Sequence, residues 1–348
     1  MKNILPILFV CLMAFSFACH HPVQYELVPT GSHLMADTVC EFPYYIEGIA
    51  FIKNNYLFMI DKYNAGRIRF YNTRTGKMDS IQAGIIIDRK TGQPKYFSMN
   101  DSTKYPDVFL QQLPLSFYQY DMRSYYTYTF ENNKVKLSRQ SFKYKRINRA
   151  EPISENKYLS TGHYNTGLFG LYDKGTKLMD YYGHYPQSVA DPFDQNWRER
   201  ELQTPQENFA FSDTHSKVVY ASDKFAYLSC YHYTGSKLKF RWEKYIVLQS
   251  ATKAVNANSE SDKSVARGRF SDVAVAGDYI YAGYSQINIP DTTHSILVYD
   301  MRGNHVTTYH IDSPISSIIV DAEGGALYGI SRKVEWEPVI VRFRFDKI

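Results

Sequence analysis

A unit of alternating strands joined by short polar turns recurs along the chain. One copy reads NYLFMIDKYNAGRIRFYNTRTGK, from Asn55 to Lys77, where an apolar strand ends in Asp61 and a second strand follows a polar turn. In the second strand, Ile68 and Phe70 alternate with polar or charged neighbours. Alternation bounded by Gly, Asn or Asp turns is the signature of β-hairpins. The stretch therefore predicts paired strands.

Similar units follow at 116–142, 158–183, 226–248, 279–311 and 326–345. Their spacing of about 50 residues is typical of propeller blades. A four-stranded meander cannot bury both of its faces alone, but it does so when it packs between neighbours in a ring. We therefore predict an all-β fold, a six-bladed β-propeller with four-stranded antiparallel blades. The predicted blades cover about 45–83, 105–143, 144–183, 207–248, 268–311 and the chain from 314 onward.

The last unit predicts how the ring closes. From Pro314 to Ile348 the chain supplies only three strands. The strand-like segment ADTVCEF, residues 36–42, is predicted to pair beside 339–345 as the fourth strand, which removes two free sheet edges. Residues 36–348 then form a single domain. One short helix is predicted at 191–203, in the longest insert.

The composition agrees with a strand-rich fold. Aromatic residues make up 16% of the chain, with 31 Tyr and 21 Phe, and aromatic residues favour strands. The net charge of +5 is too small to indicate nucleic acid, which usually requires a clustered basic face. The densest basic cluster, KYKRINR at 143–149, is interpreted as a solvated connection between blades. We expect no nucleic-acid partner.

The first 18 residues have the layout of a secretory signal peptide. Lys2 is followed by an apolar run, which is shorter than the roughly 20 residues that a membrane-spanning helix needs. Ser16 and Ala18 precede Cys19 as small residues do in a bacterial lipobox. We predict cleavage before Cys19 and lipidation of its thiol, followed by a tether over 19–35. The alternative is an ordinary signal peptide with Cys19 incidental.

The residues after Cys19 bear on localisation. His20 stands where an Asp would favour retention in the inner membrane of similar lipoproteins, and no acidic run follows. We expect an anchor in the outer membrane that faces the periplasm. After lipidation, Cys40 and Cys230 are the remaining pair of thiols. They either form a disulfide in an oxidising periplasm or lie buried and unpaired.

Several short motifs resemble a known family. The turns FMIDK, GLYDKG and LVYDMRG and the closing SSIIVDAEGGALYGISR with PVIVRFRF are similar to those of the TolB-like six-bladed β-propeller lipoproteins of Bacteroidetes. The resemblance covers nearly the whole mature chain, but the Gly-rich turn of many relatives is only partly matched by YGHYPQ at 182–187. It implies a cell-envelope propeller without a well-defined activity and supplies no catalytic residues. We expect the chain to be a monomer.

No motif in the chain predicts a particular chemistry. HExxH, CxxC, Walker-type and GxSxG patterns are absent, and we expect neither a metal nor another cofactor. Asp61, Asp173 and Asp300 recur at strand ends before turns. They are interpreted as side chains that accept hydrogen bonds from turn amides, rather than as a ring of functional carboxylates.

The candidate ligand-binding residues are aromatic and charged side chains in the inserts, because rigid scaffolds display function on loops. They are Trp197, Arg198 and Arg200 between the third and fourth blades, Tyr284 and Gln286 at the start of a long loop in the fifth, and Trp336 and Glu337 in the equivalent loop of the sixth. Such residues suit a carbohydrate or a peptide. The alternative is that the aromatic residues cover blade edges.

Two functions follow from this interpretation. The first is a lipid-anchored binding or scaffold module whose ligand is an envelope protein or a glycan. The second is a hydrolase or lyase that acts on glycans in the central funnel. A glycosidase needs paired carboxyl groups about 5–10 Å apart. In a propeller these come from different blades, so their spacing cannot be inferred from the sequence.

Overall fold

The computed structural model describes residues 25–41, 48–53, 55–61, 67–82, 85–87, 94–96, 107–111, 113–119, 124–131, 134–143, 147–162, 164, 167–174, 176–183, 208–223, 226–248, 268–286, 293–321, 325–334 and 337–345. The elements in these ranges are strands, apart from the short helix α2 (Asp107–Leu110). The all-β prediction is confirmed for this part of the chain. The helix predicted at 191–203 lies outside the described residues.

The strands form antiparallel sheets of consecutive strands, which we name after the first strand of each. The β4 sheet contains β4 (Gly48–Lys53), β5 (Tyr56–Asp61), β6 (Arg67–Asn72) and β7 (Met78–Gln82). The β10 sheet contains β10 (Leu115–Gln119), β11 (Ser124–Glu131) and β12 (Lys134–Ser141). The β13 sheet contains β13 (Ile147–Ser154), β14 (Lys157–Gly162), β15 (Phe169–Asp173) and β16 (Leu178–Tyr182).

The second half of the chain continues this pattern. The β17 sheet contains β17 (Phe209–Ser212), β18 (Lys217–Ala221), β19 (Tyr227–Tyr233) and β20 (Leu238–Leu248). The β21 sheet contains β21 (Gly268–Ala276), β22 (Tyr279–Gln286), β23 (Thr293–Asp300) and β24 (His305–Ile315). The β25 sheet contains β25 (Ile319–Asp321), β26 (Ala326–Val334) and β27 (Glu337–Arg344). One ladder pair, Ile315 with Ser331, joins β24 to β26, and β8 (Ile85–Ile87) pairs with β9 (Pro94–Tyr96) as a separate hairpin.

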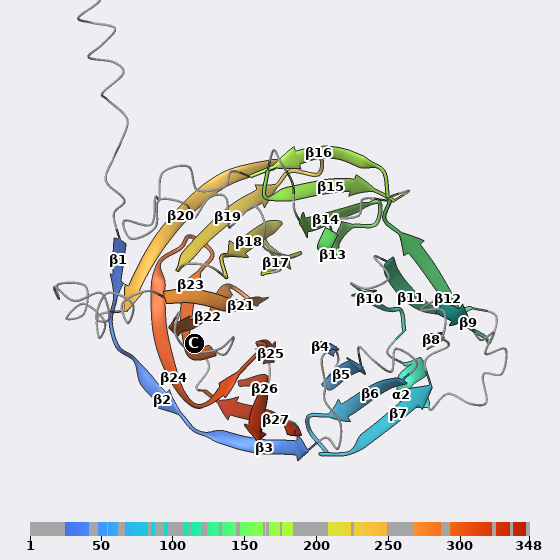
Figure 1. The fold of residues 1–348 in the computed structure, drawn as a ribbon, viewed down its shortest axis with the longest axis horizontal. Coiled ribbons are helices and arrows are strands. Elements are labelled where there is room, and N and C mark those ends of the chain that lie inside the picture. The colour runs from blue at the N-terminus through green and yellow to red at the C-terminus, as the bar shows by residue number, and fades with distance from the viewer. Residues whose placement is uncertain are drawn as a thin grey trace, which may run out of the picture.

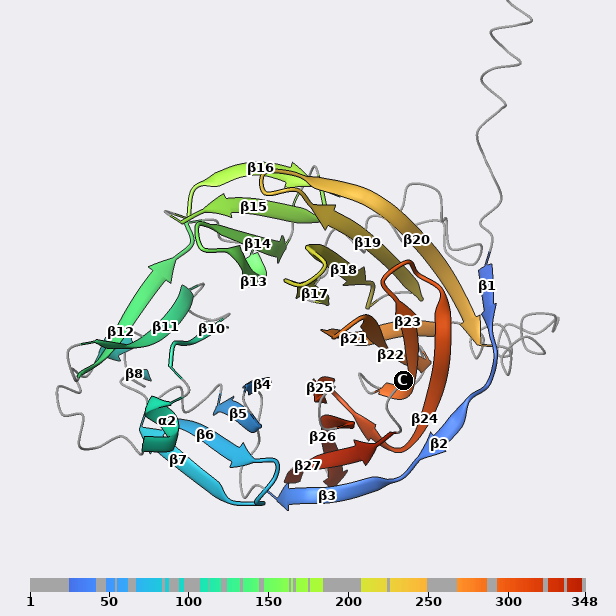
Figure 2. The same ribbon diagram turned by 180° about the vertical axis from the view of Figure 1, so that it is seen from behind.

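The sheets are arranged around a common centre (Figure 1). The first strand of each sheet, β4, β10, β13, β17, β21 or β25, lies nearest this centre, and the later strands lie toward the rim. The view from behind shows the same order (Figure 2). The first strands, although far apart in sequence, therefore lie around one common centre.

The N-terminal segment runs along the outer edges of three successive sheets, and we call residues 25–41 the strap (Figures 1 and 2). Strand β1 (Tyr25–Val28) pairs parallel with β20, and β2 (Ser32–Leu34) pairs parallel with β24. Strand β3 (Ala36–Glu41) pairs antiparallel with β27, with Ala36 opposite Phe343. The predicted pairing of residues 36–42 with 339–345 is confirmed. The predicted tether over 19–35 is wrong from residue 25 onward, because open sheet edges offer unpaired backbone groups to a neighbouring segment.

Apolar clusters fill the spaces between neighbouring sheets. Leu159 and Phe169 of the β13 sheet pack with Val218 of the β17 sheet, and Val219 packs with Phe270 of the β21 sheet. Further clusters join the β21 and β25 sheets, the β25 and β4 sheets, and the β10 and β13 sheets. Between the β4 and β10 sheets, the ring of Phe109 from α2 lies 6.2 Å from that of Phe70 and 6.1 Å from that of Tyr128.

The high tyrosine content has a structural role in these interfaces. Among the largest fully buried side chains are Tyr126, Tyr128, Tyr164, Tyr172, Tyr220, Tyr227, Tyr231, Tyr281, Tyr299 and Tyr328. Sheets arranged around a centre diverge toward the rim and leave wedge-shaped gaps between them. Large, rigid aromatic side chains fill such gaps with few rotatable bonds, so the composition and the architecture are linked.

Cys230 lies in the core of the β17 sheet as a free, buried thiol. Burial raises the pKa of this thiol to about 11, although the charges of Lys217 and Arg241 oppose the shift. Of the two alternatives for Cys230, the structure shows the unpaired one. A buried thiol with a raised pKa is mostly protonated at neutral pH and is a poor nucleophile.

Candidate functional site

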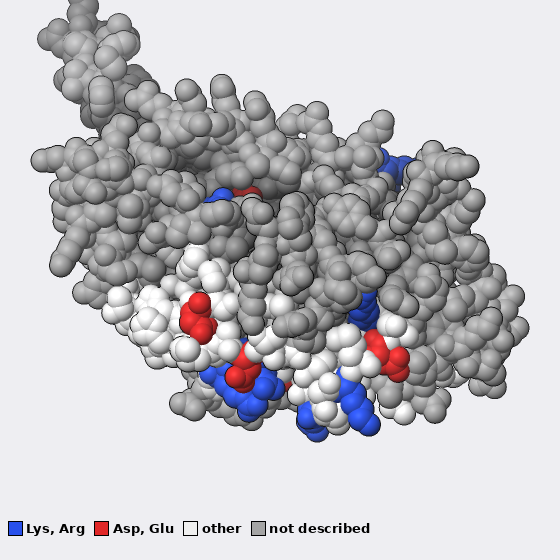
Figure 3. All heavy atoms as spheres, turned by 60° about the horizontal axis from the view of Figure 1, so that its bottom comes forward, with Lys and Arg blue, Asp and Glu red and all other residues white. Residues whose placement is uncertain are grey.

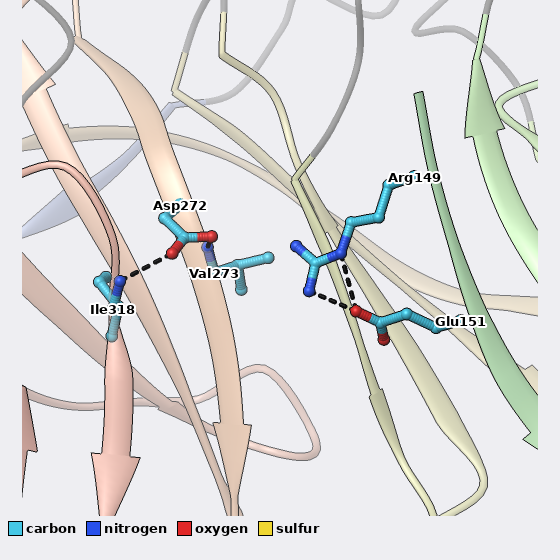
Figure 4. Close-up of polar contacts among 5 residues, drawn as sticks. All are labelled: Arg149, Glu151, Asp272, Val273 and Ile318. Carbon is cyan, nitrogen blue, oxygen red and sulfur yellow. Dashed lines mark hydrogen bonds and ion pairs between the residues drawn. The ribbon is translucent and has the colours of Figure 1, made fainter. Parts of the chain in front are cut away.

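Charged side chains from two sheets that are distant in sequence lie on strands near the centre of the molecule. Arg149 and Glu151 lie on β13, and Asp272 lies on β21 (Figure 4). All of them are on first strands, which lie nearest the centre of the molecule (Figure 1). We describe these residues, together with Ile318, as the central site.

Arg149 and Glu151 form an ion pair within one strand. Residues two apart on a strand lie on the same face, so both side chains point to the same side of β13. The Arg149 Nε donates to Glu151 Oε1 at 2.7 Å, and an Nη of the same guanidinium contacts the same oxygen. The guanidinium also lies over the ring of Phe209, 5.3 Å from its centroid. The ring and the carboxylate together hold Arg149 in one orientation.

Asp272 links two sheets through its carboxylate. The register between β21 and β22 shifts between Phe270 and Asp272, and such irregularities re-aim side chains. One carboxylate oxygen accepts the backbone N–H of Ile318 at 2.7 Å, and the other accepts that of Val273 at 2.8 Å (Figure 4). Ile318 immediately precedes β25, so the contact ties the β21 sheet to the β25 sheet.

The environment of Asp272 raises its pKa. Burial of the carboxyl group is the main cause, and it outweighs the charge of Arg149 and the two backbone hydrogen bonds, which act in the opposite direction. The residue keeps some exposed surface, but the carboxyl group itself lies deep among protein atoms. Figure 4 shows Asp272 and Arg149 facing the same central space from different sheets.

The polar groups of the central site stabilise the protein through hydrogen bonds and an ion pair, and groups of this kind also bind polar ligands. Both oxygens of Asp272 are used by backbone amides, and Glu151 is neutralised by Arg149. Within the described ranges, no group of three or more His, Cys, Asp or Glu residues is placed to hold a metal ion. Likewise, none of the described helices is long and apolar enough to cross a membrane.

Of the predicted ligand-binding residues, the structure describes Tyr284 and the backbone of Gln286 and Glu337. Trp197, Arg198, Arg200 and Trp336 lie outside the described residues. Gln286 and Glu337 have their backbone in β22 and β27, rather than in loops, and their side chains lie outside the description. Tyr284 was expected at the start of a loop, but it lies in β22 with its side chain 2% exposed.

Tyr284 belongs to the core because of its position beside a glycine. Its ring lies 6.1 Å from that of Phe270 and fills the space above Gly268, where a Cβ atom would come within 2.0 Å of the Tyr284 hydroxyl. Burial raises the pKa of Tyr284 to about 12. Strand β22 extends further than predicted, because its packing against β21 continues as far as Tyr284.

The interpretation of the recurrent aspartates is confirmed where their side chains are described. One carboxylate oxygen of Asp300 accepts the backbone N–H groups of Arg302 and Asn304, each at 2.8 Å. Burial alone would raise the pKa of Asp300, but hydrogen bonds from Asn304 and Arg302 lower it overall. Asp173 accepts the N–H of Lys177 at 2.8 Å in the same way. The side chain of Asp61 lies outside the described atoms.

Charges on the described surface are mixed in sign. Figure 3 shows the edge at the bottom of Figure 1, where basic and acidic side chains lie among one another. On this edge, Asp37 of β3 pairs with Arg342 at 3.2 Å and with Arg344 at 3.6 Å, both from β27. In the basic cluster 143–149, the Arg149 guanidinium pairs with Glu151.

Two features of the sequence indicated the residues of the central site, although only weakly. Arg149 and Glu151 stand two apart in a strand, which is the spacing of a same-face pair, but Arg149 was read as the end of a basic cluster. In RFSDVAVAG, Asp272 interrupts an otherwise apolar strand, and a charge in that position indicates a specific hydrogen-bonding role. The sequence does not show that the segments of Arg149 and Asp272 lie near each other, because this follows from how the sheets are arranged around the centre.

Comparisons with known proteins bear on the fold. No protein-family model matches the sequence, and no curated protein matches it. Among solved structures, the chain is similar to U3-55K, with a TM-score of 0.51, 9% identity, and 89% of this chain and 98% of that chain covered. It is also similar to the RRP9 WD40 repeats, with a TM-score of 0.50, 10% identity, and 89% and 97% covered.

A third similar structure is the β-propeller domain of Cps50 (Swd1) from Myceliophteria thermophila. Its TM-score is 0.50 and its identity 9%, with 89% of this chain and 100% of that domain covered. At such low identity a likeness concerns the fold alone. The fold of this chain is therefore that of β-propeller proteins.

Proposed function

We propose that the chain is a lipid-anchored, six-bladed β-propeller of the cell envelope, and that it acts as a binding or scaffold module. The observation that carries this proposal is the path of the strap. Strand β1 begins at Tyr25, only six residues after Cys19, and an extended chain of that length reaches about 20 Å. A lipid on Cys19 therefore holds the edge of β20 close to a membrane.

The proposed six blades are the six sheets named above. Their first strands surround one centre, and apolar contacts join each sheet to the next (Figure 1). The β25 sheet takes its fourth strand from β3, as a closed ring requires. In this arrangement the strap both closes the ring and leads to the anchor, which we place in the outer membrane facing the periplasm.

The ligand of the proposed module is a protein or a glycan. Propellers are rigid scaffolds, and their inter-strand loops are free to carry recognition residues. Trp197, Arg198, Arg200, Gln286, Trp336 and Glu337 remain our proposed contact residues. Tyr284 is not among them, because its side chain is buried.

We do not propose the hydrolase alternative, because no observation favours it. A glycosidase uses one protonated carboxyl group and one carboxylate that both reach the substrate. Asp272 has a raised pKa, but both of its oxygens are occupied by backbone amides. Glu151 is paired with Arg149 on the same strand.

The anchor is tested by fractionation of cells that express the full chain. The wild type is expected in the outer-membrane fraction, with a diacylglyceryl group on Cys19 detected by mass spectrometry of the N-terminal peptide. The Cys19→Ala variant is expected in the soluble periplasmic fraction. An unmodified Cys19 in the mature wild type contradicts the proposed anchor.

The binding role is tested by capture of ligands from envelope extracts and on a glycan array, with the mature chain immobilised. Trp197→Ala and Trp336→Ala are expected to lose the captured ligand, because a large aromatic side chain contributes strongly to such contacts. Phe130→Ala is the matched control, since Phe130 is an aromatic residue on β11 that is 42% exposed and does not belong to the proposed loops. Equal capture by all three variants contradicts the assignment of these loops.

A further inference from the structure

A basic pocket lies between the β17 and β21 sheets, and none of its lining residues belongs to the central site. Its volume is about 400 Å³. The cations Lys217, Arg241 and Arg302 line it, together with the titratable His215 and His232. These residues come from β18, β19, β20 and the two turns that precede β18 and β24.

A bulge in β20 builds one wall of this pocket. The pairing of β19 with β20 passes from Cys230 opposite Trp242 to Tyr231 opposite Phe240, so Arg241 is an extra residue. Without the bulge, Phe240 and Trp242 would lie on the same face of the strand. With it, Phe240 lies against the ring of Tyr231 at 5.7 Å, and Trp242 turns toward the core that joins the β17 and β21 sheets.

Hydrogen bonds across the two sheets hold the wall in place. The carbonyl oxygen of Met301 accepts the Lys217 ammonium at 2.6 Å and the Trp242 indole N–H at 3.4 Å. Gly303, with φ of +87°, lets the turn after β23 pass against the Trp242 ring, where a Cβ atom would lie only 2.9 Å from it. The pocket is thus a built feature with an aromatic wall.

The pocket keeps a positive charge. Arg241 and Arg302 are exposed, and neither forms an ion pair with a carboxylate among the described residues. Lys217 donates to a neutral carbonyl, which leaves its charge uncompensated. Of the nearby acids, Asp278 pairs with His215 at 2.7 Å. Asp300 accepts backbone N–H groups of its own turn, and its charge is attracted by that of Arg302, so it offsets part of the positive charge while Arg241 and Lys217 keep theirs.

The pocket also adjoins the beginning of the strap. Lys244 contacts Gly303 beside Trp242, since a Cβ atom on Gly303 would lie 3.2 Å from the Lys244 side chain. The ammonium of Lys244 pairs with Glu26 of β1. Strand β1 is the part of the strap nearest to Cys19 in the sequence, so the basic pocket lies on the side of the molecule that the anchor holds at the membrane.

We propose that this pocket binds the phosphate group of an anionic lipid headgroup, with Arg241, Arg302 and Lys217 around the phosphate and Trp242 against the glycerol or sugar part. Guanidinium groups match phosphate geometry, and Trp is favoured at membrane interfaces. The proposal rests on the proposed lipid anchor for its choice of ligand source. It gives the propeller a second contact with the membrane and hence a defined orientation.

The experiment uses the mature chain with Cys19→Ser, so that no attached lipid contributes. Flotation is measured with vesicles of equal parts phosphatidylglycerol and phosphatidylcholine, and with vesicles of phosphatidylcholine alone. Binding to the anionic vesicles is expected to weaken about 30-fold in the double variant Arg241→Gln/Arg302→Gln, since each basic side chain near an anionic surface contributes about 1 kcal/mol. Arg74→Gln is the control, because Arg74 is exposed in a turn of the β4 sheet.

A second measurement follows Trp fluorescence during titration with glycerol phosphate and with inorganic phosphate. A change in the wild type that is absent in Trp242→Phe is expected. If the soluble phosphates bind through Trp242 while the vesicles do not, the phosphate site is supported, but the lipid source is overturned. Equal vesicle binding by the double variant and Arg74→Gln, with no Trp242 signal, overturns the site. A chain without lipid on Cys19 in cells would overturn the anchor alone, because these measurements do not use it.

Discussion

Asp272 on β21 accepts the backbone N–H of Ile318 at 2.7 Å, across the boundary between two neighbouring sheets. The same carboxylate accepts the N–H of Val273 at its own strand. One side chain thus satisfies two backbone donors in the interior, where an unpaired donor is expensive. The contact shows how a charged residue near the centre contributes to the order of the ring.

Replacement of Asp272 by Ala is therefore expected to lower the free energy of unfolding by about 1–3 kcal/mol, because the Ile318 and Val273 amides lose their acceptor. Asp272→Asn keeps one carbonyl acceptor and should lose less. Urea denaturation monitored by circular dichroism compares the two. An Asp272→Ala variant as stable as the wild type would show that the hydrogen bond to Ile318 contributes nothing to stability.

The raised pKa of Asp272 predicts a pH dependence with a definite sign. The folded state binds the proton more tightly than the unfolded state does, so the unfolded state carries fewer protons in the window that begins at the ordinary Asp value of 3.8 and extends upward. Folding stability from this group falls as the pH rises through that window. The melting temperature of the wild type, relative to that of Asp272→Asn, should therefore fall as the pH rises through this window. A difference that does not change with pH would contradict the prediction.

The strap is expected to stabilise the whole ring. Ile340 and Val341 of β27 are buried in the intact protein, where β27 pairs with β3. Removal of residues 1–41 deletes β3 and is expected to expose both side chains. We expect the free energy of unfolding to fall by about 3 kcal/mol or more, from lost apolar burial and ladder hydrogen bonds. Removal of residues 1–24, which ends before β1, is the control. An unchanged melting temperature for the longer deletion contradicts closure by β3.

A pair of histidines couples the strap to pH. The rings of His33 on β2 and His310 on β24 lie 5.2 Å apart, and Ser295 is hydrogen-bonded to His310 at 2.9 Å. Burial, together with the nearby His33, lowers the pKa of His310 below 6.5. A lowered folded-state pKa means that stability is fully present above 6.5 and is lost as the pH falls through the folded-state value.

Thermal unfolding on either side of that window tests the coupling. The wild type should lose more stability on acidification than His33→Gln, which lacks the second ring that opposes protonation of His310. Proteolysis of the strap at low pH, read by mass spectrometry, reports whether β2 leaves β24. Identical acid sensitivity of the two proteins would show that His33 is not involved.

Gly303 and Gly235 form a matched pair for the wall of the basic pocket. Both have positive φ, +87° and +83°, so an Ala at either position meets a backbone cost of about 1–2 kcal/mol. Only at Gly303 would the added Cβ meet the Trp242 ring, at 2.9 Å, whereas nothing lies within 4 Å at Gly235. Gly303→Ala should therefore be about 1–3 kcal/mol less stable than Gly235→Ala. Equal destabilisation, measured by urea denaturation, would mean that Trp242 moves aside freely.

Local patterns in the sequence were sufficient for the strands and the closing pair. Alternation in RIRFYN and LVYD, with Asp and Gly at the turns, predicted hairpins because side chains of a strand alternate between its two faces. The count of strands after Pro314 predicted the partner of β27 because an open edge needs a cover. The strap beyond β3 was missed, since β1 and β2 have only four and three residues and pair with the edges of other sheets.

The sequence by itself determined the class of fold and the structural role of Asp173 and Asp300, because each depends on neighbours within a few residues. Only the tertiary structure decided that Tyr284 is buried, that Asp272 bonds to Ile318, and that Arg241 and Arg302 share a pocket. The reason is physical: these contacts join segments from different sheets, and their distances are set by how the sheets pack around the centre. A one-residue bulge in β20, which no local pattern indicated, turned Trp242 to the other face of its strand.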